Sequence, residues 1–337
     1  MLRSMYSGIS GMKNFQTKLD VIGNNIANVN TYGFKKERTV FKDLISQTQS
    51  GASGPSATRG GVNAIQVGLG SQLAAIDTIH TSGSMQSTGR TLDLGISGEG
   101  FFMVADSIEA PDETGVIQNP EFGPISYTRA GNFYMDKNGY LVNGDGKYLV
   151  GYANSEIGTY DALDPENPIP SNFDDEKALV DAGESLIDPT TGGLIDGTAA
   201  GAGGGTGTGT PTPGPIRVPV TAQSMSISKD GTISFVDSAG KLQYAGTLVL
   251  AKFANASGLE KTGSNYFLPT QNSGDAYVQL GTQDGIGSVN SGFVEMSNVD
   301  LSEEFTEMIV AQRGFQANSR IITTSDEILQ ELVNLKR

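Results

Sequence analysis

The chain has 337 residues, enough for two or three domains, and a net charge of −15 from 22 basic and 37 acidic residues. This acidic balance argues against nucleic acid as a partner, and the lack of cysteine excludes disulfides, thiolate metal sites and cysteine nucleophiles. No apolar run approaches 18 residues, and the opening MLRSMYSGISG lacks the apolar core and cleavage site of a signal peptide. We therefore expect no membrane span and no cleaved leader.

The first segment predicts a helix that ends near Gly33, a residue suited to a left-handed C-terminal cap. Six of eight positions that step by three and four are apolar, which is the pattern of one helix face. The stepped positions are Leu2, Met5, Ile9, Met12, Gln16, Leu19, Gly23 and Ile26. Glycines at 8, 11 and 23 would let a second backbone approach closely.

Residues 35–78 are predicted to be an irregular linker, because the loop GASGPSATRGG interrupts them and no clear period runs through them. The linker begins with a basic stretch that contains Lys35, Lys36, Arg38 and Lys42. That stretch is either a solvated face or a contact with an acidic neighbouring subunit.

From Arg90 the period changes to two, which predicts strands. Leu92, Leu94 and Ile96 alternate, and the run 101–104 predicts a buried strand. Hairpin dipeptides occur at Asn138-Gly139 and Asn143-Gly144, and the same pattern resumes beyond Met225. We expect one mainly antiparallel β domain assembled from residues 79–152 and 223–297.

Residues 153–222 are predicted to be a small insertion in that β domain. Up to Ile216 they carry eleven acidic residues and one lysine, a net charge of −10, and they contain the low-complexity run GTAAGAGGGTGTGTPTPGP. So little apolar content predicts loose packing and a position on the outer surface.

The last segment, residues 297–337, predicts a second and longer helix that starts at a capping box formed by Asp300 and Glu303. Seven of ten positions with a 3.5-residue repeat are apolar, which favours a coiled-coil seam. Those positions are Leu301, Phe305, Met308, Gln312, Phe315, Ser319, Ile322, Asp326, Leu329 and Val333. The two terminal helices are interpreted as one paired coiled-coil domain, residues 1–34 and 298–337; a helix pair inside a globular protein is the alternative.

Both ends resemble the terminal signatures of the bacterial flagellar rod and hook proteins. The N-terminal match is DVIGNNIANVNTYGFK, including Asn24, Asn25, Ile26, Asn28, Thr31, Gly33 and Phe34; the C-terminal match includes Ala311, Gln312, Arg313 and Asn318. In the middle, GRTLDLGISGEGFFMV, YTRAGNFYMDKNGYLVNGDG and SGLEKTGSNYFLPTQNSG, with the ending LVNLKR, are most similar to hook-type members. The resemblance covers the chain except roughly residues 153–222.

The resemblance implies an α+β fold in which the paired terminal helices line a tube and the β domain forms its outer wall. It also implies a homopolymer on the outside of the cell, exported through the flagellar type III apparatus without cleavage. The implied partners are further copies of the chain, the distal rod protein, the hook cap protein and the hook–filament junction protein. The residues expected to carry self-assembly are the apolar positions of both helix faces together with the matched motif residues.

No catalytic constellation is found, and we expect no cofactor, no metal and no enzymatic activity. His80, the single histidine, has no nucleophile elbow nearby. The turns at 136–139 and 143–146 resemble calcium loops but lack the Glu at the twelfth position, and hairpin turns already explain them. The run GGGTGTGTP lacks the Lys-Ser/Thr pair of a phosphate loop.

The leading interpretation is a structural subunit of the flagellar hook, a curved tube that transmits torque from rod to filament. The alternative within the family is the distal rod, a straight tube. From other classes, a secreted binding module that uses the acidic insertion and an enzyme acting on wall polysaccharide are the rivals.

Overall fold

The computed structural model describes residues 2–55, 58–107, 117, 122–153, 212–238, 240–283 and 285–335. The chain divides into two compact units. The helical unit comprises Met1–Val29, Lys35–Ile79 and Val299–Arg337, and the β unit comprises Asn30–Phe34 and His80–Asn298. A helix at each end of the chain and a central, mostly antiparallel β region confirm the predicted α+β class. Among the described residues, no helix is long and apolar enough to cross a membrane.

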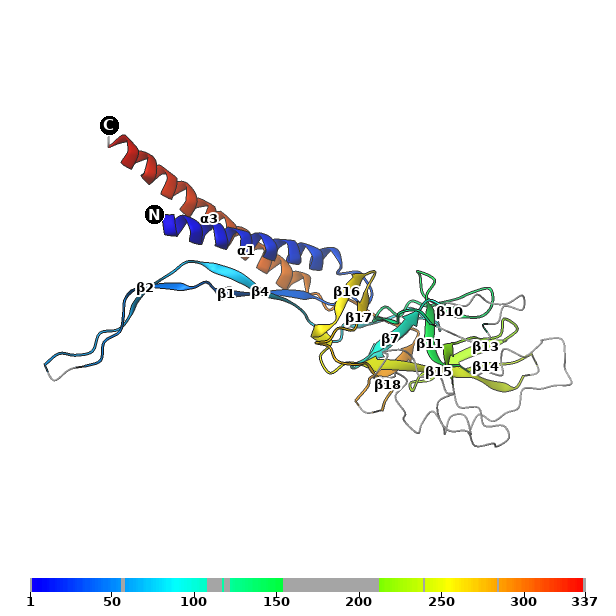
Figure 1. Cartoon of the computed structure of the whole chain (residues 1–337). Coiled ribbons are helices and arrows are strands. Elements are labelled where there is room, and N and C mark those ends of the chain that lie inside the picture. Colours follow the sequence, from blue (N-terminus) through cyan, green and yellow to red (C-terminus); the bar gives the residue numbers. More distant parts are fainter. Residues whose placement is uncertain are drawn as a thin grey trace. The chain divides into compact units, whose positions relative to one another are not determined.

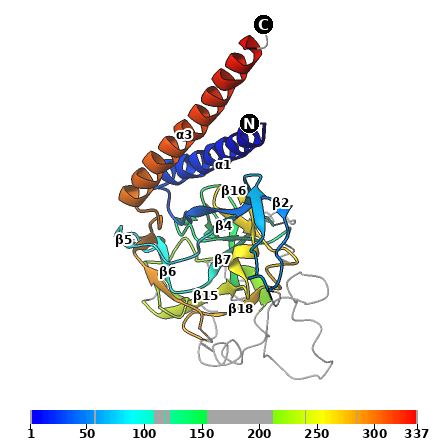
Figure 2. The same cartoon turned by 90° about the vertical axis from the view of Figure 1, so that its left-hand side faces the viewer.

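Within its described residues, the helical unit contains two helices and four strands. They are α1 (Leu2–Ala27), β1 (Glu37–Asp43), β2 (Ser46–Ser50), β3 (Ile65–Gly68), β4 (Ser71–Thr78) and α3 (Leu301–Asn334). The helices pack against each other in antiparallel directions, and α3 continues past the N-terminus of α1 (Figures 1 and 2). The helix α3 begins where the capping box predicts, since the Asp300 carboxylate accepts hydrogen bonds from the backbone N–H groups of Ser302 and Glu303.

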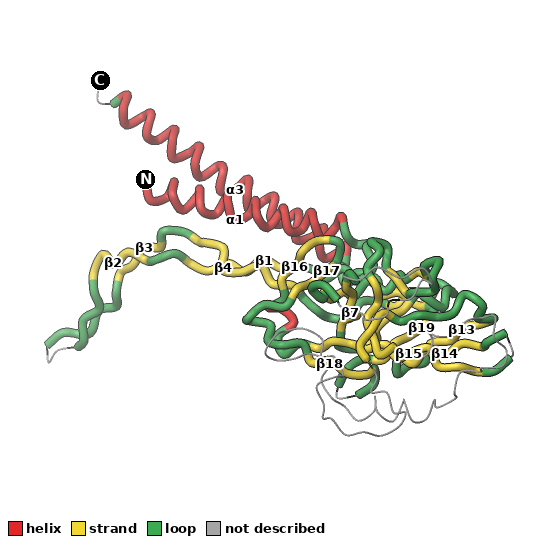
Figure 3. Tube along the Cα trace, turned by 45° about the vertical axis from the view of Figure 1, so that its right-hand side comes forward, coloured by secondary structure: helices red, strands yellow, loops and turns green. Residues whose placement is uncertain are grey.

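The prediction of an irregular linker at 35–78 is wrong, because these residues form a two-stranded antiparallel ribbon. β1 pairs with β4, and the ribbon continues through the pair β2–β3 (Figure 3). Its base packs on α1, where Asn14 Nδ2 donates a hydrogen bond to Ser71 Oγ at 2.8 Å. The ribbon carries no alternation of buried and exposed positions that a periodicity search could detect, because most of its side chains face solvent.

The β unit contains sixteen strands and one short 3-10 helix within the described residues. They are β5 (Met85–Ser87), β6 (Leu94–Ser97), β7 (Phe101–Ala105), β8 (Ser126–Thr128), β9 (Tyr134–Met135), β10 (Leu141–Val142), β11 (Tyr148–Ala153), β12 (Thr212–Pro215), β13 (Ser224–Ile227), β14 (Thr232–Val236), β15 (Leu242–Lys252), η2 (Ala256–Gly258), β16 (Glu260–Gly263), β17 (Tyr266–Leu268), β18 (Tyr277–Leu280), β19 (Ser288–Ser291) and β20 (Phe293–Glu295).

Twelve of these strands form one sheet, whose central path is β13-β14-β15-β11-β7-β8-β17-β16. β6 pairs with β19 and β5 pairs with β20 in separate two-stranded sheets. The predicted hairpin turns at 136–139 and 143–146 are confirmed, with Gly139 and Gly146 at φ values of 88° and 84°, which suit glycine. In the second turn the left-handed residue is therefore Gly146 and not Gly144 of the predicted Asn143-Gly144 dipeptide.

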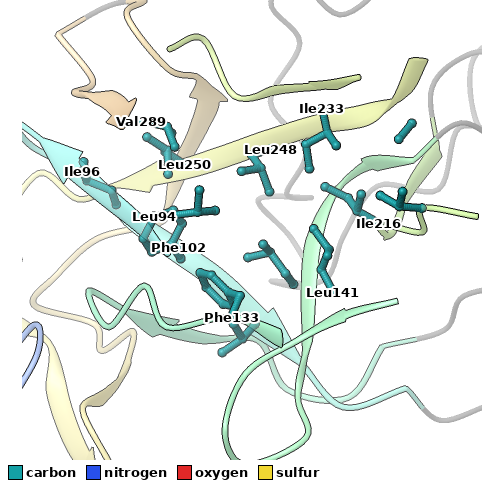
Figure 4. Packing of buried hydrophobic residues seen from close by; sticks show 14 of the residues in the cluster. Leu94, Ile96, Phe102, Phe133, Leu141, Ile216, Ile233, Leu248, Leu250 and Val289 are labelled. Atoms are coloured by element: carbon teal, nitrogen blue, oxygen red, sulfur yellow. The ribbon is translucent and has the colours of Figure 1, made fainter. Parts of the chain in front are cut away.

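The large sheet is covered on both faces, as the alternation of side chains on β7 shows. Phe102 and Val104 belong to one apolar cluster, whereas Phe101, Met103 and Ala105 belong to another. Strand β15 divides in the same way, with Leu248 and Leu250 on the first face and Val249 and Ala251 on the second. Figure 4 shows the first cluster, to which Phe102 of β7, Leu250 of β15 and Phe133, just before β9, contribute side chains.

The C-terminal end of the predicted insertion belongs to the core of the β unit, which corrects its boundary. β12 pairs with β11 from Val150↔Pro215 to Ala153↔Thr212, and Ile216 and Val218 are 0% and 1% exposed. The short apolar pattern of Ile216, Val218 and Val220 follows a Gly-rich run, and composition alone assigned it to that run. The rest of the predicted insertion, residues 154–211, lies outside the described residues.

Candidate self-assembly interface

Asn25, a residue of the N-terminal signature, joins three segments of the helical unit and is 1% exposed. Its Nδ2 donates to the backbone O of Glu37 at 2.9 Å, and its Oδ1 accepts from the backbone N–H of Glu37 at 3.0 Å. The side-chain amide thus replaces a strand partner at the start of β1. The same Nδ2 lies 3.2 Å from Glu304 Oε2 on α3.

Glu304 is the buried acid of this region, and Lys36 neutralises it. Lys36 Nζ lies 2.8 Å from Glu304 Oε1 and 2.8 Å from Glu303 Oε2. Burial alone would lower the pKa of Lys36, but the hydrogen bonds and charges of the two carboxylates outweigh it and raise that pKa above its usual value. Lys36 therefore stays charged at neutral pH and ties β1 to α3.

Glycines allow close approach of the two helices farther along the pair. A Cβ added to Gly11 would lie 2.9 Å from Asn318 Oδ1, and one added to Gly314 would lie 2.5 Å from the ring of Phe15. Asn318 also donates to the backbone O of Gly314 at 2.9 Å. These contacts fix the pairing of α1 with α3 through small and polar groups.

The less exposed positions of α3 step by four and three, with the period that the sequence indicates. The series is Glu304, Met308, Ala311, Phe315, Asn318, Ile322, Ser325 and Leu329, and Glu307, Gly314 and Ser319 beside it are also partly buried. Four of the ten predicted seam positions belong to this series, namely Met308, Phe315, Ile322 and Leu329, and a fifth, Ser319, is partly buried next to it. The other row is Glu304, Ala311, Asn318 and Ser325, which repeats every seven residues but is polar or small. A search for repeated apolar residues does not detect these four positions.

The remaining apolar side chains of the predicted seam face outward. Leu301 is 39% exposed, Phe305 50% and Val333 66%. Several unpredicted apolar side chains are exposed with them, namely Ile309, Val310, Ile321, Ile328 and Leu332 of α3 and the C-cap residue Leu335. The ribbon adds another set of exposed apolar residues, which is Ile45, Val62, Ile65, Leu73 and Ile76. Among the predicted polar positions, Gln312 and Arg313 are exposed as well.

The predicted residues of α1 divide between the helix pair and solvent. Met5, Met12, Leu19 and Ile26 are partly buried, and Ile9 and Asn24 are exposed. Leu2 lies in α1, but its side chain is outside the described part of the chain. Asn28 makes a local contact, since its Nδ2 donates to the backbone O and to Oδ1 of Asn24, both at 2.9 Å.

Gly33 and Phe34 belong to the β unit. Gly33 has φ 71°, and a Cβ there would lie 2.6 Å from the backbone of Arg129 and Ala130, so this position requires glycine. Phe34 is buried, and Lys261 Nζ lies 4.9 Å from the centre of its ring. The described contacts of these two motif residues are within the chain; their part in assembly stays a prediction.

Nothing in the described residues resembles a reaction centre. The His80 ring packs edge-on against Phe101 and Phe267, with centroids 5.6 and 5.4 Å away. No group of three or more His, Asp or Glu side chains that could hold a metal is found in the described part of the chain. A polar hollow of about 310 Å³ lies in the β unit beside Tyr266, where burial raises the pKa of the tyrosine and the hydrogen bond to Asp145 raises it further.

Three family models match the chain. They are described as "Flagella basal body rod protein" over residues 5–35, "Flagellar hook protein FlgE/F/G D1 domain" over 95–235 and "Flagellar basal body rod FlgEFG protein C-terminal" over 290–335. The flagellar basal-body rod protein FlgG of Bacillus subtilis is 49% identical over the full length of both chains. The chain belongs to the flagellar rod and hook family.

Both branches of the rod and hook family are represented among the relatives. The flagellar hook protein FlgE of Borreliella burgdorferi is 32% identical over 456 aligned residues, covering all of both chains. The FlgG rod protein of the same organism is 32% identical over 340 aligned residues, again with full coverage of each. These relatives are named as proteins of the flagellar rod and hook. Membership of the rod and hook family confirms the resemblance seen in the terminal signatures.

Proposed function

We propose that this chain is a structural subunit that polymerises through its helical unit into the axial tube of the bacterial flagellum. One observation carries the proposal: the helical unit of a single chain leaves a long series of large apolar side chains in solvent. These side chains lie on α3, which carries the C-terminal signature of the family, and on the ribbon, which follows the N-terminal signature. Exposed apolar area of this extent marks a surface that a partner covers.

The expected gain from covering this surface is large enough to drive assembly. Complete burial of one Leu, Ile, Val or Phe side chain contributes about 1.5 to 3 kcal/mol. Covering four of those on α3, such as Phe305, Ile309, Ile328 and Leu332, would therefore contribute roughly 6 to 12 kcal/mol before the entropy of association is subtracted. The partner is a second copy of this chain, which presents the exposed side chains of α1, including Ile9, to α3. A contact between two different surfaces of the same molecule gives a helical polymer when its rotation does not close a ring.

Two segments of the axial tube are candidates, and a different observation favours each. The distal rod is favoured by 49% identity to a rod protein of the same length. The hook is favoured by the middle segments quoted above and by full-length similarity to a hook protein at 32% identity. The identities favour the rod at least as strongly, so we carry both candidates and let the shape of the polymer decide.

The remaining expectations from the resemblance are part of this proposal. They are assembly with the neighbouring rod, cap and junction proteins, export without cleavage, and a position outside the cell. The division at 1–34 with 298–337, 79–152 with 223–297, and 153–222 is kept as a proposal with two changes. The ribbon joins the terminal helices, and residues 212–222 join the β unit.

Electron microscopy of the purified, concentrated chain tests the proposal. We expect hollow tubes for the natural chain, curved for a hook subunit and straight for a rod subunit. Phe305→Asp places a charge on the exposed row of α3 and should abolish the tubes, whereas Gln316→Asp, at an exposed polar position of the same helix, should preserve them. A chain that remains monomeric at every concentration, although both helices are formed, contradicts the proposal.

A further inference from the structure

Three short segments of the β unit lie next to the points where the chain passes to or from the helical unit. They are residues 30–34, residues 80–84 and residues 296–298. Any force that travels along the backbone from one unit to the other passes through these segments. Their attachment within the β unit is therefore of interest.

All three segments are attached to one residue, Glu295, the last residue of β20. Its backbone O accepts from the N–H of Gly33 at 2.8 Å, and its Oε1 accepts from the N–H of Gly83 at 2.9 Å. The third segment follows Glu295 directly in the chain. One residue thus holds the first two segments by hydrogen bonds and the third by a covalent bond.

The second carboxylate oxygen of Glu295 is held by Arg129. Arg129 Nη1 lies 3.0 Å from Glu295 Oε2, and the two side chains are 3% and 0% exposed. Arg129 Nη2 donates to the backbone O of Gly98 at 2.7 Å, and the guanidinium lies 5.4 Å from the centre of the Phe101 ring. The pair is therefore anchored in the turn between β6 and β7 and in the core of the β unit.

A buried ion pair in this position has no stabilising advantage over apolar side chains of the same volume. Unlike apolar side chains, the ion pair forms directional hydrogen bonds, and these can hold several backbone segments at the same time. The second and third segments are also bound to each other, since Met296 N–H donates to the O of Ser84 at 2.9 Å and Asn298 Nδ2 donates to Thr81 Oγ1 at 2.9 Å. A Cβ on Gly83 would lie 2.0 Å from Met296 O, so the two backbones are in direct contact.

We propose that the Arg129–Glu295 ion pair is a joint that makes the three connecting segments hold and open together. Without the guanidinium, the Glu295 carboxylate is a buried charge with one partner fewer, and β20 withdraws from the positions of Gly33 and Gly83. The segments at 30–34, 80–84 and 296–298 then become mobile as a group, although they are far apart in the sequence. The mechanical consequence, transmission of force between the two units, rests on the proposed function; the coupling of the segments does not.

Hydrogen exchange of the full chain in solution tests the joint. In Arg129→Met we expect backbone amides in all three segments to exchange at least tenfold faster, while those of β15 in the sheet centre keep their rates. Asp106→Asn is the matched control, because it removes a surface ion pair of the same unit, with Lys147 at 2.7 Å, outside the turn that holds Arg129, and should change no segment.

A second variant covers the case in which Arg129→Met also accelerates exchange in β15. Glu295→Gln keeps the side-chain length and the acceptor for Gly83 but removes the charge, and it should release the same three segments. Faster exchange at 80–84 alone, or in none of the segments, overturns the proposal. Tube formation by the natural chain plays no part in this test, so the joint and the proposed function can fail separately.

Discussion

The two units of this chain distribute their apolar side chains in opposite ways. Among the described residues of the helical unit, the buried apolar side chains are Val21, Ile22 and Ala311, while most of the large apolar side chains exposed on the chain also belong to it. The β unit buries apolar clusters on both faces of its main sheet. A unit with its own core folds alone, whereas a unit whose close contacts use glycine, asparagine and serine leaves its hydrophobic surface for neighbours.

Removal of α3 is the strongest way to separate the two units. Deleting Ser302–Arg337 takes away the helix that α1 packs against, but no core residue of the β unit. We expect a soluble, β-rich monomer that retains cooperative unfolding and forms no tubes. Circular dichroism, sedimentation and electron microscopy measure these three properties. Tubes formed by the truncated chain would assign assembly to the β unit and reverse the comparison.

Phe305 and Phe315 sharpen the comparison inside α3, because the first is half exposed and the second lies in the helix pair. Phe305→Asp should prevent tube formation while changing the unfolding free energy of the free chain by less than about 0.5 kcal/mol. Phe315→Asp should prevent tubes and also destabilise the helix pair by about 1 to 3 kcal/mol. Denaturant titration of the two monomers distinguishes the variants. Equal destabilisation by both would mean that Phe305 is also an intrachain contact.

Substitution of one glycine in each unit tests whether both units require glycine at positions where the backbone is strained or crowded. Gly33→Ala should destabilise the β unit by at least about 2 kcal/mol, since a Cβ at φ 71° would meet the backbone of Arg129 and Ala130. Gly23→Ala should stabilise α1 by about 0.4 to 1 kcal/mol, because no atom lies within 4 Å of a Cβ there. Chemical denaturation of the full chain gives both values. A neutral Gly33→Ala would show that the backbone at 129–130 yields easily.

Asn25 and Asn24 are neighbours in the signature with different expected effects. Asn25→Ala removes the amide that pairs with Glu37 and contacts Glu304, and should cost about 1 to 3 kcal/mol in the helical unit. Asn24→Ala loses only the local contact with Asn28 and should cost less than about 0.5 kcal/mol. Hydrogen exchange at the start of β1 reports the difference. Equal effects would mean that Asn25 is dispensable for the attachment of β1.

The smallest effect is expected from the region between β11 and β12. Ala153 pairs with Thr212, so a short Gly-Asn turn can join the two strands as a hairpin in place of residues 154–211. We expect the same melting temperature within a few degrees and normal tubes, since shortening a loop changes the closure entropy slowly. Differential scanning calorimetry and microscopy provide the measurements. Loss of tubes from a stable, folded chain would assign a subunit contact to residues 154–211.

Much of the fold could be predicted because it depends on local patterns. The apolar run that begins at Phe101, the turns at 136–139 and 143–146 and the Asp300 cap each specify their element through interactions within a few residues. The ribbon could not be predicted, since strands such as β2 (SQTQS) are exposed and are held by pairing with a distant partner. The core position of Ile216 likewise depends on pairing across residues 154–211.

The candidate interface was predictable in period and only partly in register. The apolar residues of α3 that contact α1 and those that remain exposed follow the same periodicity. The periodicity alone therefore cannot tell the buried face of the helix from the exposed one. The separating information lies in Glu304, Ala311, Asn318 and Ser325, whose spacing of seven residues is regular but whose side chains are small or polar. Their burial follows from the nearby glycines of α1 and from Lys36 and Asn25, and these pairings require the tertiary structure.

The coverage of both faces of the main sheet limits how neighbouring β units can touch in a polymer. A sheet with one uncovered apolar face would pack that face against a neighbouring sheet, and the close packing would hold the two units in one fixed arrangement. Because the described part of this sheet buries side chains on both faces, we expect neighbours in the proposed polymer to meet it through its edges and turns, where small displacements exchange one hydrated contact for another at little cost in free energy. We therefore expect neighbouring β units of the proposed polymer to shift against one another while each keeps its own fold, so that the outer layer can shear.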